Sequence, residues 1–174
     1  MRPHFGSSLV FSLALLFGPA LHTQQVSPPA TAVCDFDSSH QIAVEYAPLT
    51  VDLKRFAFGR EIPFNRAWTP GGRPLTLFIN HPVIVGDKEL PVGAYTMFVI
   101  PSEKQWTLVV SRSTDTSGKY DEREDLVRMP METGELSSAE NEFSVYFAHE
   151  GPDRCSMRLD LAKQRAWVVF QDKK

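Results

Sequence analysis

The sequence predicts an all-β protein that folds as a single antiparallel β-sandwich, and three observations carry this prediction. Apolar and polar residues alternate in several runs from residue 33 onward, which is the period of a half-buried strand. Residues 95–100 are apolar at both parities, as expected for a strand that is covered on both faces. The best helix candidate, residues 120–127 (YDEREDLV), is mostly charged, and turn-forming residues recur about every ten positions, as in sandwich folds.

The first residues are not expected to be part of the fold. Arg2 supplies positive charge, residues 9–17 (LVFSLALLF) are apolar, and small residues follow, so residues 1–20 have the layout of a secretory signal peptide. The apolar run is too short to cross a bilayer comfortably. Residues 21–32 are polar and contain prolines, and we interpret them as a disordered leader. The sandwich domain is then expected over residues 33–174, exported to the periplasm or beyond, with no transmembrane segment.

The size and charge of the mature chain restrict its partners. About 140 residues remain for folding, enough for one domain with its own core. Loss of Arg2 leaves 17 basic side chains against 21 acidic ones, a net charge of −4. The chain has no basic block of the kind that follows a phosphate backbone, so we expect no nucleic-acid partner.

Both cysteines, Cys34 and Cys155, lie in the exported part. In an oxidising compartment, an even pair is interpreted first as a disulfide. Such a bridge would stabilise the fold by about 4–5 kcal/mol on the chain-entropy model. The alternative, a lipid anchor on Cys34, fits poorly because Val33 precedes it and the apolar core of the signal ends far upstream, at Phe17.

The strands are assigned in chain order from their parity. Residues expected to face the core share one parity in each run: Ile42, Val44 and Tyr46; Val127, Met129 and Met131; Phe143, Val145 and Phe147; Cys155, Met157, Leu159 and Leu161; Ala166, Val168 and Phe170. Pro130 favours an edge or irregular strand over residues 126–131. Ser156, Arg158 and Asp160 are expected on a solvent-exposed face.

The centre of the chain predicts a meander of three antiparallel strands. Its strands are residues 83–85, 95–100 and 106–110, with turns at residues 86–87 and 102–105. The middle strand should be buried on both faces.

These central residues carry a resemblance to a known family. LPVGAYTMFVIP (residues 90–101), followed by WTLVVSR (residues 106–112), resembles the centre of the exported bacterial family called domain of unknown function 2911. Further positions match the family's pattern: Arg55, Phe58-Gly59, Pro63-Phe64, Trp68, Tyr120, Asp125 and Arg128. The resemblance implies an exported all-β domain, and the family's name leaves its activity unassigned.

One segment departs from the family's pattern. Where the family has a polar run containing Arg, Asn and Glu after its tryptophan, this chain has TPGGRPLT over residues 69–76. Only Trp68, Gly71 and Thr76 remain of that segment. The resemblance therefore implies a changed ligand more readily than a lost fold.

No motif for a catalytic nucleophile is present, since the chain has neither Gly-x-Ser-x-Gly nor Ser-x-x-Lys. His40, His81 and His149 lack the short spacing of metal ligands, so we predict no metal and no cofactor, although His81 is the histidine of most interest. Calcium is disfavoured because neither the acidic stretch at residues 35–39 nor that at residues 115–121 has the glycine and glutamate of an EF-hand loop.

Two functional hypotheses follow. Trp68 precedes a Gly/Pro-rich turn that carries Arg73, and a loop tryptophan beside an arginine is a reasonable recognition pair. We therefore predict a non-catalytic module that binds a small molecule, glycan or protein through Arg66, Trp68, Arg73 and His81. The alternative is a hydrolase or metal-dependent enzyme whose scattered residues meet around the Trp68 loop. A structural role for Trp68, filling one end of the sandwich, stays open.

Overall fold

A computed structural model describes residues 28–174. The predicted signal peptide and residues 21–27 of the predicted leader lie outside the described residues. The first strand begins at Ala30, so its first three residues belong to the predicted leader. That boundary was wrong because Ala32 pairs with Val44 and is buried in the core. Within the described part of the chain, no helix is long and apolar enough to cross a membrane.

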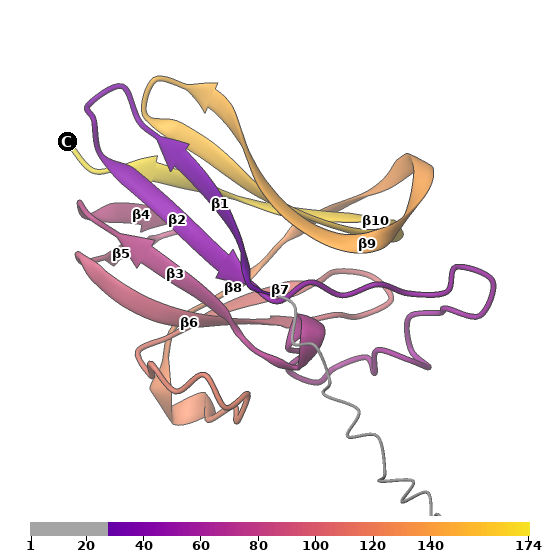
Figure 1. The fold of residues 1–174 in the computed structure, drawn as a ribbon. Helices are drawn as coiled ribbons and strands as arrows, with labels where there is room; N and C mark the ends of the chain where they lie inside the picture. The colour runs from indigo at the N-terminus through magenta and orange to yellow at the C-terminus, as the bar shows by residue number, and fades with distance from the viewer. Residues whose placement is uncertain (1–27) are drawn as a thin grey trace, which may run out of the picture.

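The predicted antiparallel β-sandwich is confirmed (Figure 1). One sheet has the order β1-β2-β3-β6-β7-β8. Its strands are β1 (Ala30–Asp35), β2 (Gln41–Tyr46), β3 (Leu75–Ile79), β6 (Gly93–Ile100), β7 (Thr107–Ser111) and β8 (Asp125–Pro130). The other sheet has the order β5-β4-β10-β9. Its strands are β4 (Val83–Val85), β5 (Lys88–Leu90), β9 (Glu132–Gly151) and β10 (Arg154–Asp172).

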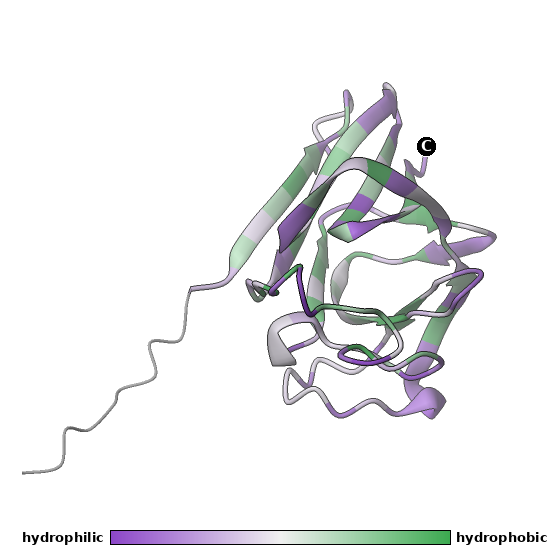
Figure 2. Cartoon of the chain, turned by 90° about the vertical axis from the view of Figure 1, so that its right-hand side faces the viewer, coloured by the Kyte–Doolittle hydropathy of each residue, from purple (hydrophilic) through white to green (hydrophobic). Residues whose placement is uncertain are grey.

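The core lies between the two sheets and follows the predicted parities. Figure 2 shows hydrophobic and hydrophilic bands that follow one another along the strands. Ile42 and Val44 of β2, Leu77 of β3 and Met157 of β10 are fully buried. All of these residues belong to one continuous apolar cluster. Alternation along each strand therefore directs one face inward, as the sequence predicts.

The prediction that residues 95–100 are buried on both faces is confirmed, because an apolar cluster covers each side of this strand. Met97 and Val99 point into the main core, whereas Phe98 and Ile100 form a second cluster with Val109 on the outer side of the sheet. Tyr120, in the connection between β7 and β8, covers this second cluster.

The predicted three-stranded meander was wrong in its first strand. β6 and β7 form a hairpin as expected, but β4 pairs with β5 and β10 in the opposite sheet. Pro91 and Val92 carry the chain across from β5 to β6. The short hairpin at Gly86 can therefore close within one sheet before the chain changes layer.

The predicted exposed face of residues 156–160 was also wrong. Ser156 and Asp160 are buried. Two hydrogen bonds from the Arg165 guanidinium, at 2.8 and 2.7 Å, and one from the Tyr146 hydroxyl, at 3.2 Å, satisfy the Asp160 carboxylate. Arg165 reaches it because the chain bulges at Ala162, whose φ is 54°. Pairing of opposite charges allows this acidic side chain to be buried.

Candidate functional site

The connection between β2 and β3, residues 47–74, closes one side of the sandwich (Figure 1). Its first leg pairs with the four-stranded sheet through Thr50 and Glu142. Its second leg pairs with the six-stranded sheet through Trp68 and Val99, where the Trp68 amide donates to the Val99 carbonyl at 2.7 Å. Each leg is therefore held by a different sheet, which fixes the space between the legs.

Trp68 is half-buried and packs on its inner side against the aromatic core. Its ring lies 5.5 Å from that of Phe143 and 6.3 Å from that of Trp106, both in edge-on arrangements. Edge-to-face pairs of this kind add stability beyond the area that they bury. Trp68 thus fills one end of the sandwich, the structural role that the sequence left open.

The same indole also forms one wall of a cavity of about 420 Å³ between the two legs. This volume is within the range of pockets that hold small ligands. Apolar side chains and polar groups share the lining: Leu49, Val51, Phe56, Ile62 and Trp68, with Thr50, Asp52, Arg55, Glu61, Thr69, Gly71 and Gly72. We refer to this cavity as the Trp68 pocket.

The charges of the Trp68 pocket are paired locally. The Arg55 guanidinium lies 3.8 Å from the Asp52 carboxylate. The Arg60 guanidinium donates to the Glu61 carboxylate at 2.7 Å. The hydrogen bonds from Arg60 and from the Ala57 amide lower the pKa of Glu61 below its usual value. The rim of the pocket is therefore polar but carries no large excess charge.

A short 3₁₀ turn, Pro70–Gly72, lies between Trp68 and β3, and Gly71 and Gly72 line the Trp68 pocket. Gly71 has a φ of 63°, and a β-carbon added there would lie 2.7 Å from that of Ala47. Glycine is thus required at this position both by the backbone and by the close approach of the chain. Gly72 also has positive φ, at 80°, but a β-carbon there would meet nothing within 4 Å.

The two arginines predicted as binding residues, Arg66 and Arg73, do not line the Trp68 pocket. Arg66 is exposed and does not line the Trp68 pocket. Arg73 lines a separate cavity of about 240 Å³ together with Glu45 and Tyr46. Gly71 borders both cavities, so Trp68 and Arg73 approach the same turn from two sides. The predicted Trp68–Arg73 recognition pair does not share one pocket.

His81 is not near Trp68, contrary to our expectation. Five residues of β3 separate the two ends, a distance of about 17 Å in an extended strand. His81 lies where the chain passes from β3 to β4, and its ring stacks on that of His40 at 3.4 Å with an interplanar angle of 5°. Both histidines face the carboxylate of Asp172, the last residue of β10.

Asp172 is almost completely buried at this end of the sandwich. Burial alone raises the pKa of its carboxyl, but hydrogen bonds from Ser38 and His40 and the charges of His40 and His81 bring it below the usual value. The Ser38 hydroxyl donates to one carboxylate oxygen at 2.6 Å. Asp172 is therefore a carboxylate at neutral pH.

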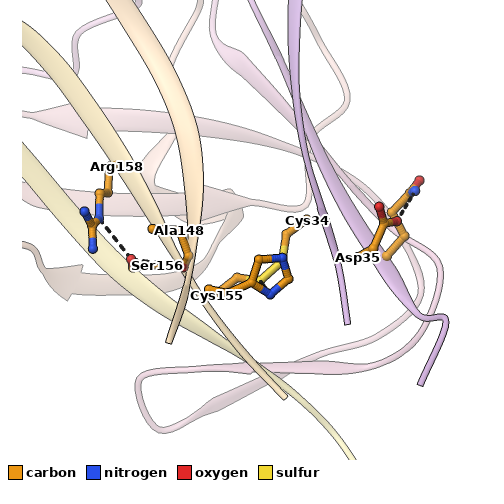
Figure 3. Close-up of a disulfide and its surroundings, with 8 residues drawn as sticks. Cys34, Asp35, Ala148, Cys155, Ser156 and Arg158 are labelled. Carbon is orange, nitrogen blue, oxygen red and sulfur yellow. Dashed lines mark hydrogen bonds between the residues drawn. A yellow bond between two sulfur atoms is a disulfide. The ribbon is translucent and has the colours of Figure 1, made fainter. Parts of the chain in front are cut away.

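The predicted Cys34–Cys155 disulfide is confirmed, with a Cα–Cα distance of 6.6 Å. Figure 3 shows it joining β1 of one sheet to β10 of the other. The imidazole of His149 lies beside it, 3.9 Å from the Cys34 sulfur and 3.8 Å from the Cys155 sulfur. Both sulfurs are in the bridge, so the group formed by Cys34, Cys155 and His149 has no thiolate that could bind a metal ion.

Three residues matched by the resemblance form a hydrogen-bonded group on the outer side of the six-stranded sheet. The Tyr120 hydroxyl donates to Asp125 at 2.7 Å, and Arg128 donates to the same hydroxyl at 2.8 Å. Burial, aided by Asp125, raises the pKa of Tyr120 to about 12. Because the Tyr120 ring packs at 5.1 Å against that of Phe98, this group has an evident structural role.

Sequence reasoning missed most of the Trp68 pocket and the partners of His81. Asp52, Phe56 and Glu61 lie in an irregular segment, where no periodicity marks the residues that will face inward. His40 and Asp172 are separated by 132 positions, so no local spacing could have connected them.

Comparison with curated proteins and with solved structures gives no significant match. A family model matches residues 27–170, which cover all strands of the sandwich except the last two residues of β10. Its description is protein of unknown function (DUF2911). The chain belongs to the DUF2911 family.

Proposed function

We propose that this protein binds a small organic molecule in the Trp68 pocket, with an apolar or sugar-ring face of the ligand stacked on the indole. The observation that carries the proposal is the position of Trp68, whose ring packs on one side against Trp106 and Phe143 and borders an open cavity. A tryptophan held rigidly in this way offers contact area at little entropic cost.

The lining indicates the kind of ligand. Leu49, Val51 and Phe56 supply an apolar body, and Thr50 and Thr69 add hydroxyl groups. The carboxylates at the rim already have arginine partners, so they do not demand a cationic ligand. A neutral ring compound with hydroxyl or amide groups at its edge fits this combination.

The enzyme alternative has less support at this site. Among the residues that line the Trp68 pocket there is no histidine, cysteine or lysine, and the carboxylates of Asp52 and Glu61 are engaged with arginines. General acid–base chemistry favours a group whose pKa lies near the working pH. The lining therefore supports binding better than hydrolysis.

A ligand screen by thermal shift on the mature protein tests the proposal, with one set of aromatic compounds and one set of mono- and disaccharides. A binding compound is re-measured on Trp68→Phe, which keeps an aromatic ring in the core, and on Trp68→Ala. We expect the alanine variant to lose about 2 kcal/mol of binding or more, roughly thirtyfold in affinity. Trp167→Ala, a tryptophan variant in the four-stranded sheet, is the matched control and should bind as wild type.

Arg73→Ala separates the two neighbouring cavities. Because Arg73 lines the other cavity, we expect its loss to change the affinity less than about threefold. Circular dichroism confirms that each variant is folded. A compound that binds Trp68→Ala as tightly as wild type, or that is lost only in Arg73→Ala, contradicts the proposal.

We also propose that the protein is exported to the periplasm or the cell exterior. The features of residues 1–20 support this, as does the disulfide, because such bonds persist in oxidising compartments. N-terminal sequencing of the protein from its native host should find a chain that begins at residue 21 or shortly after. A full-length cytosolic chain with two free thiols would contradict it.

A further inference from the structure

Three distant segments bring imidazole and carboxylate groups together at the end of the sandwich opposite the Trp68 pocket. His40 lies at the end of the β1–β2 hairpin and His81 in the β3–β4 crossing. Asp172 ends β10, where it pairs with Val83. Hydrogen bonds fix the backbones, from the Asp172 amide to the Asp153 carbonyl at 2.8 Å and from the Lys173 amide to the Pro82 carbonyl at 3.0 Å. The group therefore rests on rigid elements of both sheets.

The ligand atoms of the three side chains lie close together. Nδ1 of His40 lies 2.9 Å from Oδ1 of Asp172, and Nδ1 of His81 lies 3.2 Å from the same oxygen. All three ligand atoms lie within 4.8 Å of one another. A tetrahedral ion with bonds of about 2.0–2.1 Å holds its ligand atoms about 3.3 Å apart. Because the two rings are parallel, one of them must rotate about its side-chain bonds before both nitrogens can point at the same ion.

One atom of the group has no hydrogen-bond partner. Nδ1 of His81 is buried, and although it lies 3.2 Å from Asp172 its direction does not form a hydrogen bond. Buried polar atoms in native proteins nearly always have a partner. The His40 ring, stacked on that of His81 at 3.4 Å, already takes the hydrogen bonds to both carboxylate oxygens. A cation bound at Nδ1 in the plane of the His81 ring would give this nitrogen a partner.

We propose that His40, His81 and Asp172 form a binding site for a divalent transition-metal ion of the zinc class. Two imidazoles and a carboxylate are ligands that such ions accept. The Ser38 hydroxyl, hydrogen-bonded to the second oxygen of Asp172 at 2.6 Å, would orient the carboxylate as supporting residues do in metal sites. The imidazoles are about one-third exposed, at 32% and 34%, so the remaining coordination positions face solvent and can take water or an external ligand.

Binding would change the tautomer of His40. The hydrogen bond from Nδ1 of His40 to the Asp172 carboxylate requires a proton on that nitrogen. A metal ion at Nδ1 would displace it, and in a neutral imidazole the proton would then be carried by Nε2.

The test is a titration of the mature, tag-free protein with Zn²⁺ by calorimetry and with Co²⁺ by visible absorption. We expect one ion per chain, a loss of at least about 100-fold in affinity in His81→Ala and Asp172→Asn, and a loss of about tenfold in Ser38→Ala. His149→Ala is the matched control, because His149 lies outside the proposed site, and the variant should change the affinity less than about threefold. A mature chain that begins at residue 21 also carries His22, so His22→Ala is a second control with the same expected result.

A second readout needs no variant, and so does not depend on folding. In the wild-type protein, Zn²⁺ should shift the imidazole NMR signals of His40 and His81 and leave those of His149 in place. The proposal is overturned by three results: no saturable binding below about 1 mM Zn²⁺, equal binding by His81→Ala and wild type, or Zn²⁺-dependent shifts at His149 alone.

Discussion

Replacing Cys34 and Cys155 together with alanine removes the covalent link between the two sheets. The cross-linked residues are separated by 121 positions, and closing a loop of that length in the unfolded chain corresponds to about 5 kcal/mol on the chain-entropy model. Small domains are stable by about 5–15 kcal/mol in total. The variant should therefore be marginally folded, with a melting temperature about 10–20 °C lower than that of wild type.

Urea unfolding followed by far-ultraviolet circular dichroism measures this difference. If the bridge acts on the unfolded state, the variant should also show a larger m-value, because its unfolded chain exposes more surface. Both cysteines are buried, so reductant added to the folded wild-type protein should have little effect. A free energy of unfolding within about 1 kcal/mol of wild type would refute the chain-entropy reasoning.

Three further predictions concern the scaffold. Gly71→Ala should lower the free energy of unfolding by about 1 kcal/mol more than Gly72→Ala in urea titrations, since both glycines have positive φ but only Gly71 is in close contact; equal effects would contradict the clash. Tyr120, whose pKa is raised to about 12, should ionise late in a spectrophotometric titration. Its contribution to stability is present below about pH 10 and lost as the pH rises through about 12; survival of the late step in Tyr120→Phe would assign it to another tyrosine. Leu77→Ala should cost about 2–5 kcal/mol in thermal unfolding, and Phe78→Ala, at an exposed neighbour, clearly less; similar losses would contradict the assigned parity.

The sequence predicts much of this fold because alternation is a local property. In β2 the apolar residues of one parity face the core, and they can be identified without knowing the partner strand. In β10 the core parity changes at the bulge at Ala162, so each half of the strand has to be assigned separately. Alternation does not identify the sheet to which a strand belongs. The sequence of residues 83–85 predicts a strand. It does not predict the pairing with β10, whose partner residues lie almost ninety positions later.

The candidate sites were harder to predict for the same reason. Trp68 could be identified because it precedes a Gly/Pro-rich turn, whereas Asp52 and Phe56 face it from an irregular leg of the connection. His40 and His81 each look like ordinary surface histidines in the sequence. They become a pair only because β2 and β3 are neighbours in the sheet and Asp172 ends the strand that lies against β4.

The most direct test of the proposed function is a ¹H–¹⁵N NMR titration of the mature protein with a compound that binds in the screen. The chain has three tryptophans, each of which contributes one indole signal, assigned by single Trp→Phe variants. Trp68 borders the proposed pocket, whereas Trp167 lies in the four-stranded sheet against a different cavity. Binding in the Trp68 pocket predicts a saturable shift of the Trp68 indole signal with the Trp167 signal unchanged. A saturable shift at Trp167 with Trp68 unmoved would contradict it.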